Sequence, residues 1–506
     1  MDLKEQVIKN SFWNTVLGLI NRTGGIILII LISRALKPEG FGVYSLAMTI
    51  SLFFSTFSDF GINQTLIRHV ASEIDKNNGK AAAYFKYLFK VRFFITSIAS
   101  IILLLISYPL SFYILKNQSL FIPLLILSLY VFFMSLEGFF ESLLFVKKQV
   151  KYISLKETIF QSSRILAVFL VFYFIASKFK IIGIFYSYLI ISILVLLFVF
   201  FLSKRFYPFL FEKSKEKINK KKISKFIFFL NIENILLIIL SQASIIFLGI
   251  FLSAEYVGYF NSSLILSLSI YTLLSLSYIF LPILTKLKGL KFKIGLQKIF
   301  RLLMTITIPI SFGLALLSRF FVFLIYGEDY LIAAPILSIL SFMIPCIVGA
   351  DLCLTSFSAK GKPKIFVKVI FLPTLILLIL NYILLKIFSN ISPESVLIYI
   401  ALANLVTWFF YLISSIFLLK KEFKVNLINK ELIKPLVSSL IMSIFIYFLL
   451  KILGDMNIFK GIFVILLGMV IYFTSLTLMK GFGKEELDFI RIFLKKPQTI
   501  QPIQTK

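Results

Sequence analysis

Charged and amide side chains interrupt several long apolar runs, and their spacing places them on single helix faces. Glu137 and Glu141 lie four residues apart, which puts both carboxylates on one side of an α-helix. The next apolar run carries Glu157, Gln161 and Arg164 at spacings of four and three. An ionisable group in the middle of a membrane span costs about 2.5–3.5 kcal/mol on insertion scales. Groups retained at that cost face a cavity or a partner, so we expect a polar site inside the protein.

These two runs are expected to form an antiparallel hairpin of helices that turns near residues 150–151. Reflection of the sequence about that point places Glu137 opposite Arg164. Two interpretations stay open: the residues form a buried ion pair that pins the hairpin, or they line one wall of a substrate cavity.

The first apolar run has a narrow polar face. Asn14, Gly18, Arg22 and Gly25 recur at helical spacing, a pattern that also suits a seam of small residues between packed helices. Arg22 has no carboxylate in its own run, and a guanidinium stays charged when buried and binds phosphate through paired hydrogen bonds. We interpret this face as part of a cavity wall, and the polar stripe of the second run, which includes Asp59, as its neighbour.

The second half of the chain carries fewer charges inside its apolar runs. Asn231 and Glu233 lie in one run, Asp351 lies in another, and neither acid has a partner of opposite charge close in the sequence. The sequence contains no cluster of His and Cys at metal-ligand spacing and no glycine-rich phosphate loop. We therefore expect no metal site and no catalytic residues.

Composition indicates that these apolar runs lie in a lipid bilayer. Hydrophobic residues make up 59% of the 506 residues, whereas a soluble domain carries roughly 45–50% apolar residues, and the runs have the length of about 20 residues that spans a bilayer. The sequence predicts an all-α, polytopic membrane protein. Its fourteen expected membrane helices cover residues 11–33, 41–66, 93–113, 119–146, 157–177, 181–203, 226–252, 256–283, 302–325, 331–359, 369–385, 394–419, 435–450 and 461–479.

The formal net charge of +30 is distributed unevenly between the two sides of the predicted membrane. Of the 53 Lys and Arg, 42 lie in the N-terminus, the even-numbered loops and the C-terminal tail, 8 lie in the odd-numbered loops and 3 lie within spans. Because positive loops stay on the cytoplasmic side, we expect a multi-pass protein of the cytoplasmic membrane with both termini in the cytoplasm. The basic loops then rest on anionic lipid headgroups, and we expect no nucleic-acid partner.

One short pattern occurs twice. "PEGFGVYSLA" begins at Pro38 and "AEYVGYFNSS" begins at Ala254, 216 residues later, and each links two predicted helices on the same side of the membrane. A second echo, "PLLILSL" at Pro123 and "PILSILS" at Pro335, has an offset of 212. This is the signature of a parallel repeat about an axis along the membrane normal. Locally, Gly42 and Gly258 permit tight backbone geometry at a helix start.

The segment "ISRALKPEGFGVYSLAMTISLFFSTFSDFGINQTLIRHVAS" (residues 32–72) resembles the polysaccharide-biosynthesis or oligosaccharide flippases, which share a superfamily with lipid II flippases and multidrug and toxic-compound extrusion transporters. "LIYGEDYLIAAPILSILSF" (residues 324–342) resembles a second segment of that family. The resemblance implies two six-helix lobes in pseudo-two-fold repeat around a central cavity, followed by two extra helices. We assign the lobes to residues 1–218 and 219–425, and the extra helices and tail to residues 426–506.

The resemblance also implies roles for single residues. In lipid-linked sugar flippases, arginines of the first helix line the cavity and meet anionic headgroups, which suits Arg22. Related multidrug transporters hold their cation-binding acids on the helices that here carry Asn231, Glu233 and Asp351, so these three are candidates for a Na⁺ or H⁺ coupling site. The remaining cavity candidates form the substrate-binding set: Asn14, Asp59, Glu137, Glu141, Gln161 and Arg164.

These observations predict a transporter that flips a lipid-linked oligosaccharide across the cytoplasmic membrane by alternating access. The expected partners are the polyprenyl-phosphate or diphosphate sugar and membrane lipids, with glycosyltransferases or polymerases of glycan assembly as further partners, and no cofactor beyond a coupling ion. The alternative is a cation-coupled multidrug exporter. A membrane enzyme is disfavoured because every odd-numbered loop is short. A scaffold that recruits glycosyltransferases stays open.

Overall fold

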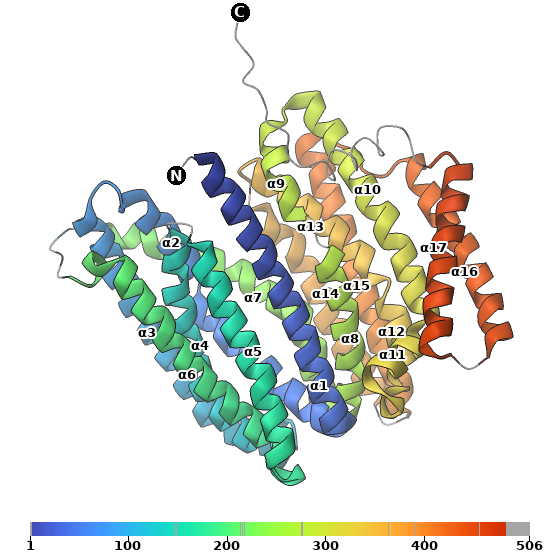
Figure 1. Cartoon of the computed structure of the whole chain (residues 1–506), viewed down its shortest axis with the longest axis horizontal. Helices are drawn as coiled ribbons and strands as arrows, with labels where there is room; N and C mark the ends of the chain where they lie inside the picture. Colours follow the sequence, from blue (N-terminus) through green and yellow to red (C-terminus); the bar gives the residue numbers. More distant parts are fainter. Residues whose placement is uncertain are drawn as a thin grey trace, which may run out of the picture.

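The computed structural model describes residues 3–481 except 147–148, 213, 215, 217, 275–276, 363, 390 and 455. Within the described helices, the side chains of residues 3–23, 221–222, 224–231, 277–279 and 282 are not described. All regular secondary structure in the described ranges is helical. Figure 1 shows the helices side by side, with α1 beginning at the end that is uppermost in that view. That end is called the upper end below, and the opposite one the lower end.

The first lobe, the N-lobe, contains six α-helices, of which α2 is short. They are α1 (Leu3–Asp59), α2 (Ile62–Glu73), α3 (Asn78–Pro109), α4 (Phe121–Val146), α5 (Val150–Phe174) and α6 (Lys180–Phe206). The second lobe, the C-lobe, contains α7 (Lys220–Phe251), α8 (Ala254–Leu274), α9 (Ser277–Lys286), α10 (Gly289–Leu316), α11 (Ser318–Tyr326), α12 (Ala333–Leu340), α13 (Met343–Ala359), α14 (Ile365–Phe388) and α15 (Pro393–Phe423). Two further helices follow, α16 (Ile433–Leu453) and α17 (Ile458–Leu478). The assigned domain boundaries remain predictions.

Short helical turns of three to five residues connect several of these helices. They are η1 (Leu110–Ile114), η2 (Gln118–Leu120), η3 (Ser177–Phe179), η4 (Pro208–Phe211), η5 (Glu328–Tyr330) and η6 (Lys430–Leu432).

The first two predicted membrane helices are joined within α1. The backbone reverses at Lys37, whose φ of 58° and ψ of 174° are not helical, and Pro38 follows it. Proline fixes its own φ and lacks an N–H, so it suits the first turn of the returning helix. Three predicted spans are each divided between two helices in the structure: the second between α1 and α2, the ninth between α10 and α11, and the tenth between α12 and α13. The eighth predicted span covers most of α8 and the start of α9.

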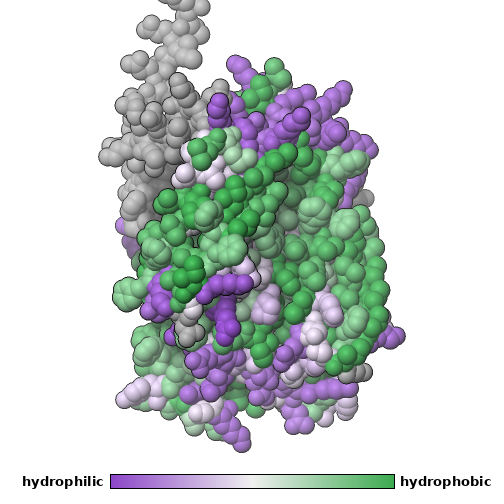
Figure 2. All heavy atoms as spheres, turned by 90° about the vertical axis from the view of Figure 1, so that its right-hand side faces the viewer, coloured by the Kyte–Doolittle hydropathy of each residue, from purple (hydrophilic) through white to green (hydrophobic). Residues whose placement is uncertain are grey.

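Twelve described helical segments are long and apolar enough to cross a membrane. They correspond to the third to the fourteenth predicted spans. The first predicted span and most of the second, up to Asp59, fall within α1, and the second span ends in α2. Figure 2 shows, on the face that carries α16 and α17, an apolar band between two polar ends. The all-α, polytopic fold predicted from the sequence is confirmed.

The buried apolar residues divide into clusters that show how the lobes meet. The largest cluster joins the lower part of the N-lobe to the C-lobe and includes Leu28, Phe41, Tyr188, Val257 and Phe260. The upper part of the N-lobe has its own cluster, built from α2–α6 with Tyr207 and Ile223. The two lobes therefore share one core at the lower end, whereas the cluster in the upper part of the N-lobe is built mainly from that lobe and includes Ile223 of α7.

Candidate functional site

Two glycines meet at the lower end, where the two copies of the repeated pattern come together. A Cβ on Gly42 would lie 1.6 Å from the carbonyl oxygen of Ala254, and a Cβ on Gly258 would lie 2.1 Å from that of Pro38. The second contact is the first one shifted by the repeat, because 38 and 42 correspond to 254 and 258. Neither glycine has a positive φ. Glycine is needed here for close backbone approach between α1 and α8, and not for the turn geometry expected from the sequence.

Polar side chains continue this seam toward the membrane interior. Asn261 Nδ2 donates a hydrogen bond of 2.8 Å to Ser45 Oγ, a buried pair whose members are again 216 residues apart. One turn further along α1, Thr49 Oγ1 donates to Gln242 Oε1 of α7 at 3.2 Å. The repeat detected in the sequence is thus a physical interface between the lobes.

The lower rim carries a second set of contacts between the lobes. Tyr330 OH in η5 donates to the carbonyl oxygen of Ser33 at 2.8 Å. Arg34 Nε donates to the carbonyl oxygen of Ile325 at 2.7 Å, and Arg34 Nη2 donates to that of Leu324 at 2.5 Å. These carbonyls belong to the last turn of α11, where helical partners are missing. The rim contacts and the glycine crossing together close the lower end.

A buried ionic cluster lies between α4 and α5 of the N-lobe. The ammonium Nζ of Lys156 lies 3.0 Å from Glu137 Oε1, 3.1 Å from Glu141 Oε1 and 3.2 Å from Glu157 Oε2. Gln161 Nε2 donates to Glu157 Oε1 at 2.8 Å. The side chains of Lys156 and Glu141 are 5% and 21% exposed. Four residues chosen from sequence spacing are brought together, around a lysine that the sequence interpretation missed.

Arg164 occupies a different position from the one predicted. Its guanidinium lies over the ring of Tyr188, 4.3 Å from the centroid, and 5.1 Å from that of Phe160. Its Nε has no hydrogen-bond partner among the described residues. The ion pair that the structure gives Glu137 is with Lys156, so the predicted opposition of Glu137 and Arg164 is wrong. The physical reason is the turn: α4 ends at Val146 and α5 begins at Val150, earlier than the assumed centre.

Asp59 is engaged in a structural contact at the end of α1. Arg92 Nη1 lies 2.9 Å from Asp59 Oδ1 and donates to the carbonyl oxygen of Ser58 at 2.6 Å. Arg92 Nε and Nη2 donate to the carbonyl oxygen of Ser135 at 3.1 and 2.8 Å. This nearly fully buried arginine ties α1, α3 and α4 together. This ion pair accounts for an acid at position 59, and the place of Asp59 in the substrate-binding set stays a prediction.

The acids of the C-lobe lie on separate helices. Asp351 of α13 is partly buried and accepts a hydrogen bond from Tyr271 OH of α8. Glu233 of α7 is half-buried. A carboxylate held by one phenol hydroxyl retains free acceptor positions, so Asp351 keeps capacity for a further donor or cation.

Three predicted site residues lie where side chains are not described. Asn14 and Arg22 fall within the bounds of α1, and Asn231 falls within those of α7. Their proposed roles rest on the sequence.

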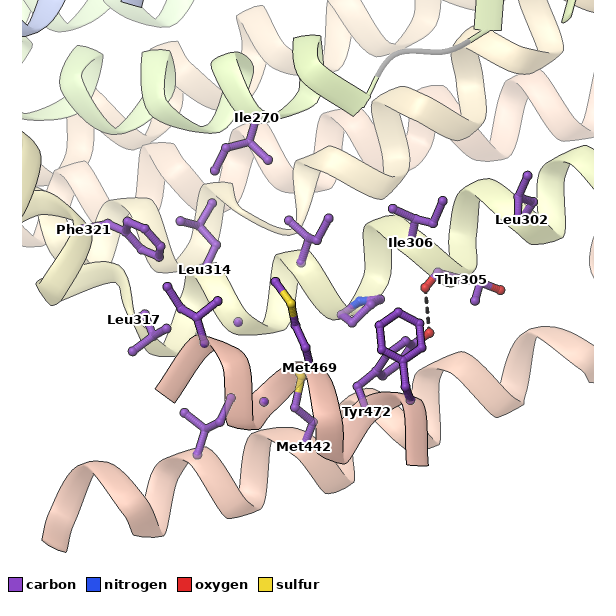
Figure 3. A pocket seen from close by; sticks show the side chains of 17 residues that line it. Ile270, Leu302, Thr305, Ile306, Leu314, Leu317, Phe321, Met442, Met469 and Tyr472 are labelled. Atoms are coloured by element: carbon purple, nitrogen blue, oxygen red, sulfur yellow. Dashed lines mark hydrogen bonds between the residues drawn. The ribbon is translucent and has the colours of Figure 1, made fainter. Parts of the chain in front are cut away.

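An apolar groove separates the C-lobe from the two additional helices. It has a volume of about 450 Å³, and 17 residues of α8, α10, α11, α16 and α17 or next to them line it. Figure 3 shows Leu302, Ile306, Leu314, Met442 and Met469 around it. Figure 3 also shows the hydrogen bond that Tyr472 OH donates to the carbonyl oxygen of Thr305 at 2.6 Å, by which these two polar groups satisfy each other. The groove offers an apolar surface to a hydrocarbon chain.

Sequence interpretation missed Lys156 and Arg92 for the same reason. Both were counted as loop cations because the corresponding helices were expected to begin at residues 157 and 93, whereas α5 begins at Val150 and α3 at Asn78. Helical spacing carried the missed signal for Lys156, since it directly precedes Glu157 and shares its hairpin with two carboxylates. No group of three or more His, Cys, Asp or Glu in the described part of the chain has a geometry that could hold a metal ion.

Comparison with solved structures identifies the fold. The structure of a lipid II flippase, MurJ, in an inward closed conformation superposes with a TM-score of 0.74 at 18% identity, over 96% of this chain and 100% of that one. An inward-facing multidrug transporter of the MATE family superposes with a TM-score of 0.59 at 12% identity, over 79% of this chain and 95% of that one. At these identities the comparisons define a shared fold.

Comparison of sequences gives the family. An uncharacterised membrane protein in the cps region of Klebsiella pneumoniae is 26% identical over 392 residues, which cover 74% of this chain and 77% of that protein. The family of polysaccharide biosynthesis proteins matches residues 7–288. This match covers more than half of the chain and contains the N-lobe from residue 7 onward and the repeated pattern of the C-lobe. The chain belongs to the polysaccharide biosynthesis protein family.

Proposed function

We propose that this protein flips a lipid-linked oligosaccharide, a polyprenyl phosphate or diphosphate that carries a sugar, across the cytoplasmic membrane. Such a substrate has a polar, anionic head and a long hydrocarbon tail, so its carrier needs a polar interior beside an apolar surface. The observation that carries the proposal is the groove of about 450 Å³ between α10 and α16–α17, on the same molecule as the charged interior of the N-lobe. The family and the MurJ-like fold support this assignment.

In the proposed cycle the upper end faces the cytoplasm, as the distribution of Lys and Arg indicates. The sugar head enters between the lobes from that end, and Arg22 binds the phosphate. Movement of one lobe against the other opens the seam at Gly42 and Gly258 and exposes the head outside. The tail remains in the groove and in lipid throughout. The coupling ion is Na⁺ or H⁺, with Asn231, Glu233 and Asp351 as the proposed C-lobe site.

The test is translocation in proteoliposomes. Purified protein is supplied with a polyprenyl-diphosphate oligosaccharide, and the accessibility of the head on the opposite leaflet is followed over time. We expect Arg22→Ala to lower the rate about tenfold or more, because a hydrogen bond to a charged group contributes about 1.5–3 kcal/mol. Arg22→Lys should retain part of the rate, since it keeps the charge but loses paired contact. Wild-type rates in Arg22→Ala would remove Arg22 from the mechanism.

A cation-coupled drug exporter is the second candidate. The observation in its favour is the buried contact of Asp351 with Tyr271 in the C-lobe, together with half-buried Glu233. The same vesicles separate the two functions. Absence of flipping with several lipid-linked glycans, combined with efflux of organic cations under a Na⁺ or H⁺ gradient, would assign the protein to drug export.

A further inference from the structure

The Lys156 cluster contains more negative than positive charge. Every ion pair that the structure describes for Glu137, Glu141 and Glu157 goes to the same ammonium. Three ionised carboxylates around one ammonium leave a formal excess of two negative charges. Carboxylates that share a site disfavour each other's ionised form, so one of them takes up a proton most readily.

Among the side chains that the structure describes, no cation other than Lys156 forms an ion pair with these three carboxylates. From α5, the Arg164 guanidinium lies over aromatic rings. From α3 and α1, Arg92 and Asp59 pair with each other. Other titratable or charged groups described on these helices include Tyr130 of α4, Lys151 and Tyr152 of α5, and Arg68 and His69 of α2. Tyr44 of α1 and Tyr188 of α6 share a hydrogen bond, and His69 stacks on Tyr84. The side chain of Arg22, two residues before Gly24 on α1, is not described.

The cluster also lacks a hydrogen-bond donor. An ammonium has three N–H donors, and three carboxylates surround Lys156 at hydrogen-bonding distance. Gln161 gives an amide N–H to Glu157, while its own Oε1 is buried and accepts no hydrogen bond among the described residues. Gln161 is 8% exposed and packs against Gly24 of α1, whose Cβ would lie 3.1 Å from Gln161 Cβ. A buried acceptor without a donor is costly.

We propose that the Lys156 cluster is a proton-binding site, in which Glu137, Glu141 and Glu157 share one exchangeable proton. Glu141 is the entry, because its side chain is the most exposed of the three, at 21%. Glu137 and Glu157 hold the proton deeper, beside Gln161. In the proposed transport cycle this proton is the coupling ion of the N-lobe, separate from the C-lobe acids, and to that extent the inference rests on the proposed function.

The experiment measures the proton directly and does not depend on transport. Infrared spectra of lipid-reconstituted protein are recorded between about pH 5 and pH 9, where unperturbed carboxyls are ionised. The background variant Glu233→Gln/Asp351→Asn removes the C-lobe acids from the signal.

We expect a C=O band of a protonated carboxyl that shifts in deuterated buffer. Glu137→Gln, Glu141→Gln or Glu157→Gln should each reduce or abolish it, whereas the control Glu422→Gln, whose carboxylate pairs with Lys362, should leave it unchanged.

Two further measurements complete the test. Lys156→Met should strengthen the band, because the carboxylates lose their one counter-ion, and an unchanged or weaker band in a folded variant would contradict the proposal. Replacement of choline by Na⁺ at fixed pH tests whether Na⁺ competes for the site. An unchanged band indicates a site that binds only a proton, and a weaker band indicates that Na⁺ displaces the proton. Both results support an exchangeable cation here. Absence of the band in the background protein, or its persistence in all three Glu→Gln variants, overturns the proposal. Because none of these readouts requires flipping, a failed flipping assay would overturn the proposed function and leave the proton site standing.

Discussion

Gly42 of α1 and Gly258 of α8 lie where these two helices cross at the lower end, and at each glycine the backbone of the opposite helix occupies the space that a Cβ would take. The missing Cβ atoms would lie 1.6 Å from Ala254 O and 2.1 Å from Pro38 O, and the two contacts are related by the internal repeat. The helices α1 and α8, from different lobes, thus contact each other through equivalent positions of the two copies of the repeated pattern. A pseudo-symmetric seam of this kind can separate as a unit, because no side chain interlocks across the glycines themselves.

Adding one carbon at either glycine should force the seam apart. We expect Gly42→Ala and Gly258→Ala each to destabilise the closed form by about 3 kcal/mol or more, at the upper end of the cost of overpacking, because the contacts are with backbone atoms. Thiol labelling of a cysteine introduced at Ser33, on the lower rim, should become faster. Gly25→Ala is the matched control, since nothing lies within 4 Å of its Cβ. Equal labelling rates in all three variants would show that the seam accommodates the extra carbon.

Cross-linking the seam should stop transport. In a background with Cys346 and Cys353 replaced by Ala, Ser45→Cys/Asn261→Cys places two thiols where a hydrogen bond of 2.8 Å now joins the lobes. Bridging them should reduce flipping to background, and reduction should restore it. The control is Ser244→Cys/Asn404→Cys, which replaces a 2.9 Å hydrogen bond within the C-lobe and should keep its rate when bridged. Undiminished flipping by the cross-linked Ser45–Asn261 pair would mean that this seam never opens.

Loss of Arg92 should cost more stability than loss of its acid. Arg92→Gln leaves Asp59 unpaired and removes the donors to the carbonyl oxygens of Ser58 and Ser135, so we expect about 3–5 kcal/mol, the cost of breaking a buried ion pair. Asp59→Asn leaves those carbonyl contacts in place and should cost about 1–3 kcal/mol. Thermal unfolding of the purified variants in detergent measures the difference. The reverse order would assign Asp59 a role beyond this ion pair.

Glu137 should be energetically coupled to Lys156 and not to Arg164. A double-mutant cycle with Glu137→Gln and Lys156→Met is expected to give an interaction free energy of about 0.5–3 kcal/mol, typical of residues in one ionic network. The corresponding cycle with Arg164→Gln is expected to be additive within about 0.5 kcal/mol, because the Arg164 guanidinium lies over Tyr188. Unfolding midpoints of the four proteins in each cycle provide the values. Coupling of Glu137 to Arg164 alone would contradict the described cluster.

Filling the groove should affect long lipid tails selectively. Gly313 lines the groove, and nothing lies within 4 Å of its Cβ, so Gly313→Phe places a ring in free space. We expect slower flipping of substrates with long polyprenyl chains and little change for short-chain analogues. Gly313→Ala adds one carbon and serves as the graded control. An equal effect on both chain lengths would show that the tail does not use this groove.

Much of the architecture follows from the sequence alone. Apolar runs of bilayer length, with basic residues concentrated in alternate loops, specify the number and order of membrane helices because the bilayer excludes unpaired backbone groups and charge. The offset of 216 residues between Pro38 and Ala254 specifies the repeat. Helical spacing also placed Glu137 and Glu141 on one face of one helix, and Glu157 and Gln161 on one face of the next, and these four residues do lie in one cluster.

Only the tertiary structure identifies the partners of these residues. Lys156 and Arg92 were assigned to loops from hydropathy, because a helix that extends beyond the apolar run carries no hydropathy signal. In the folded protein these two cations neutralise acids on neighbouring helices, over separations of 19 residues for Lys156 and Glu137 and 33 for Arg92 and Asp59. The close approach of Gly42 and Gly258 is likewise a property of two packed helices. Sequence periodicity defines which face of a helix is polar, whereas the identity of the group opposite depends on turn length, helix extension and packing between segments far apart in the chain.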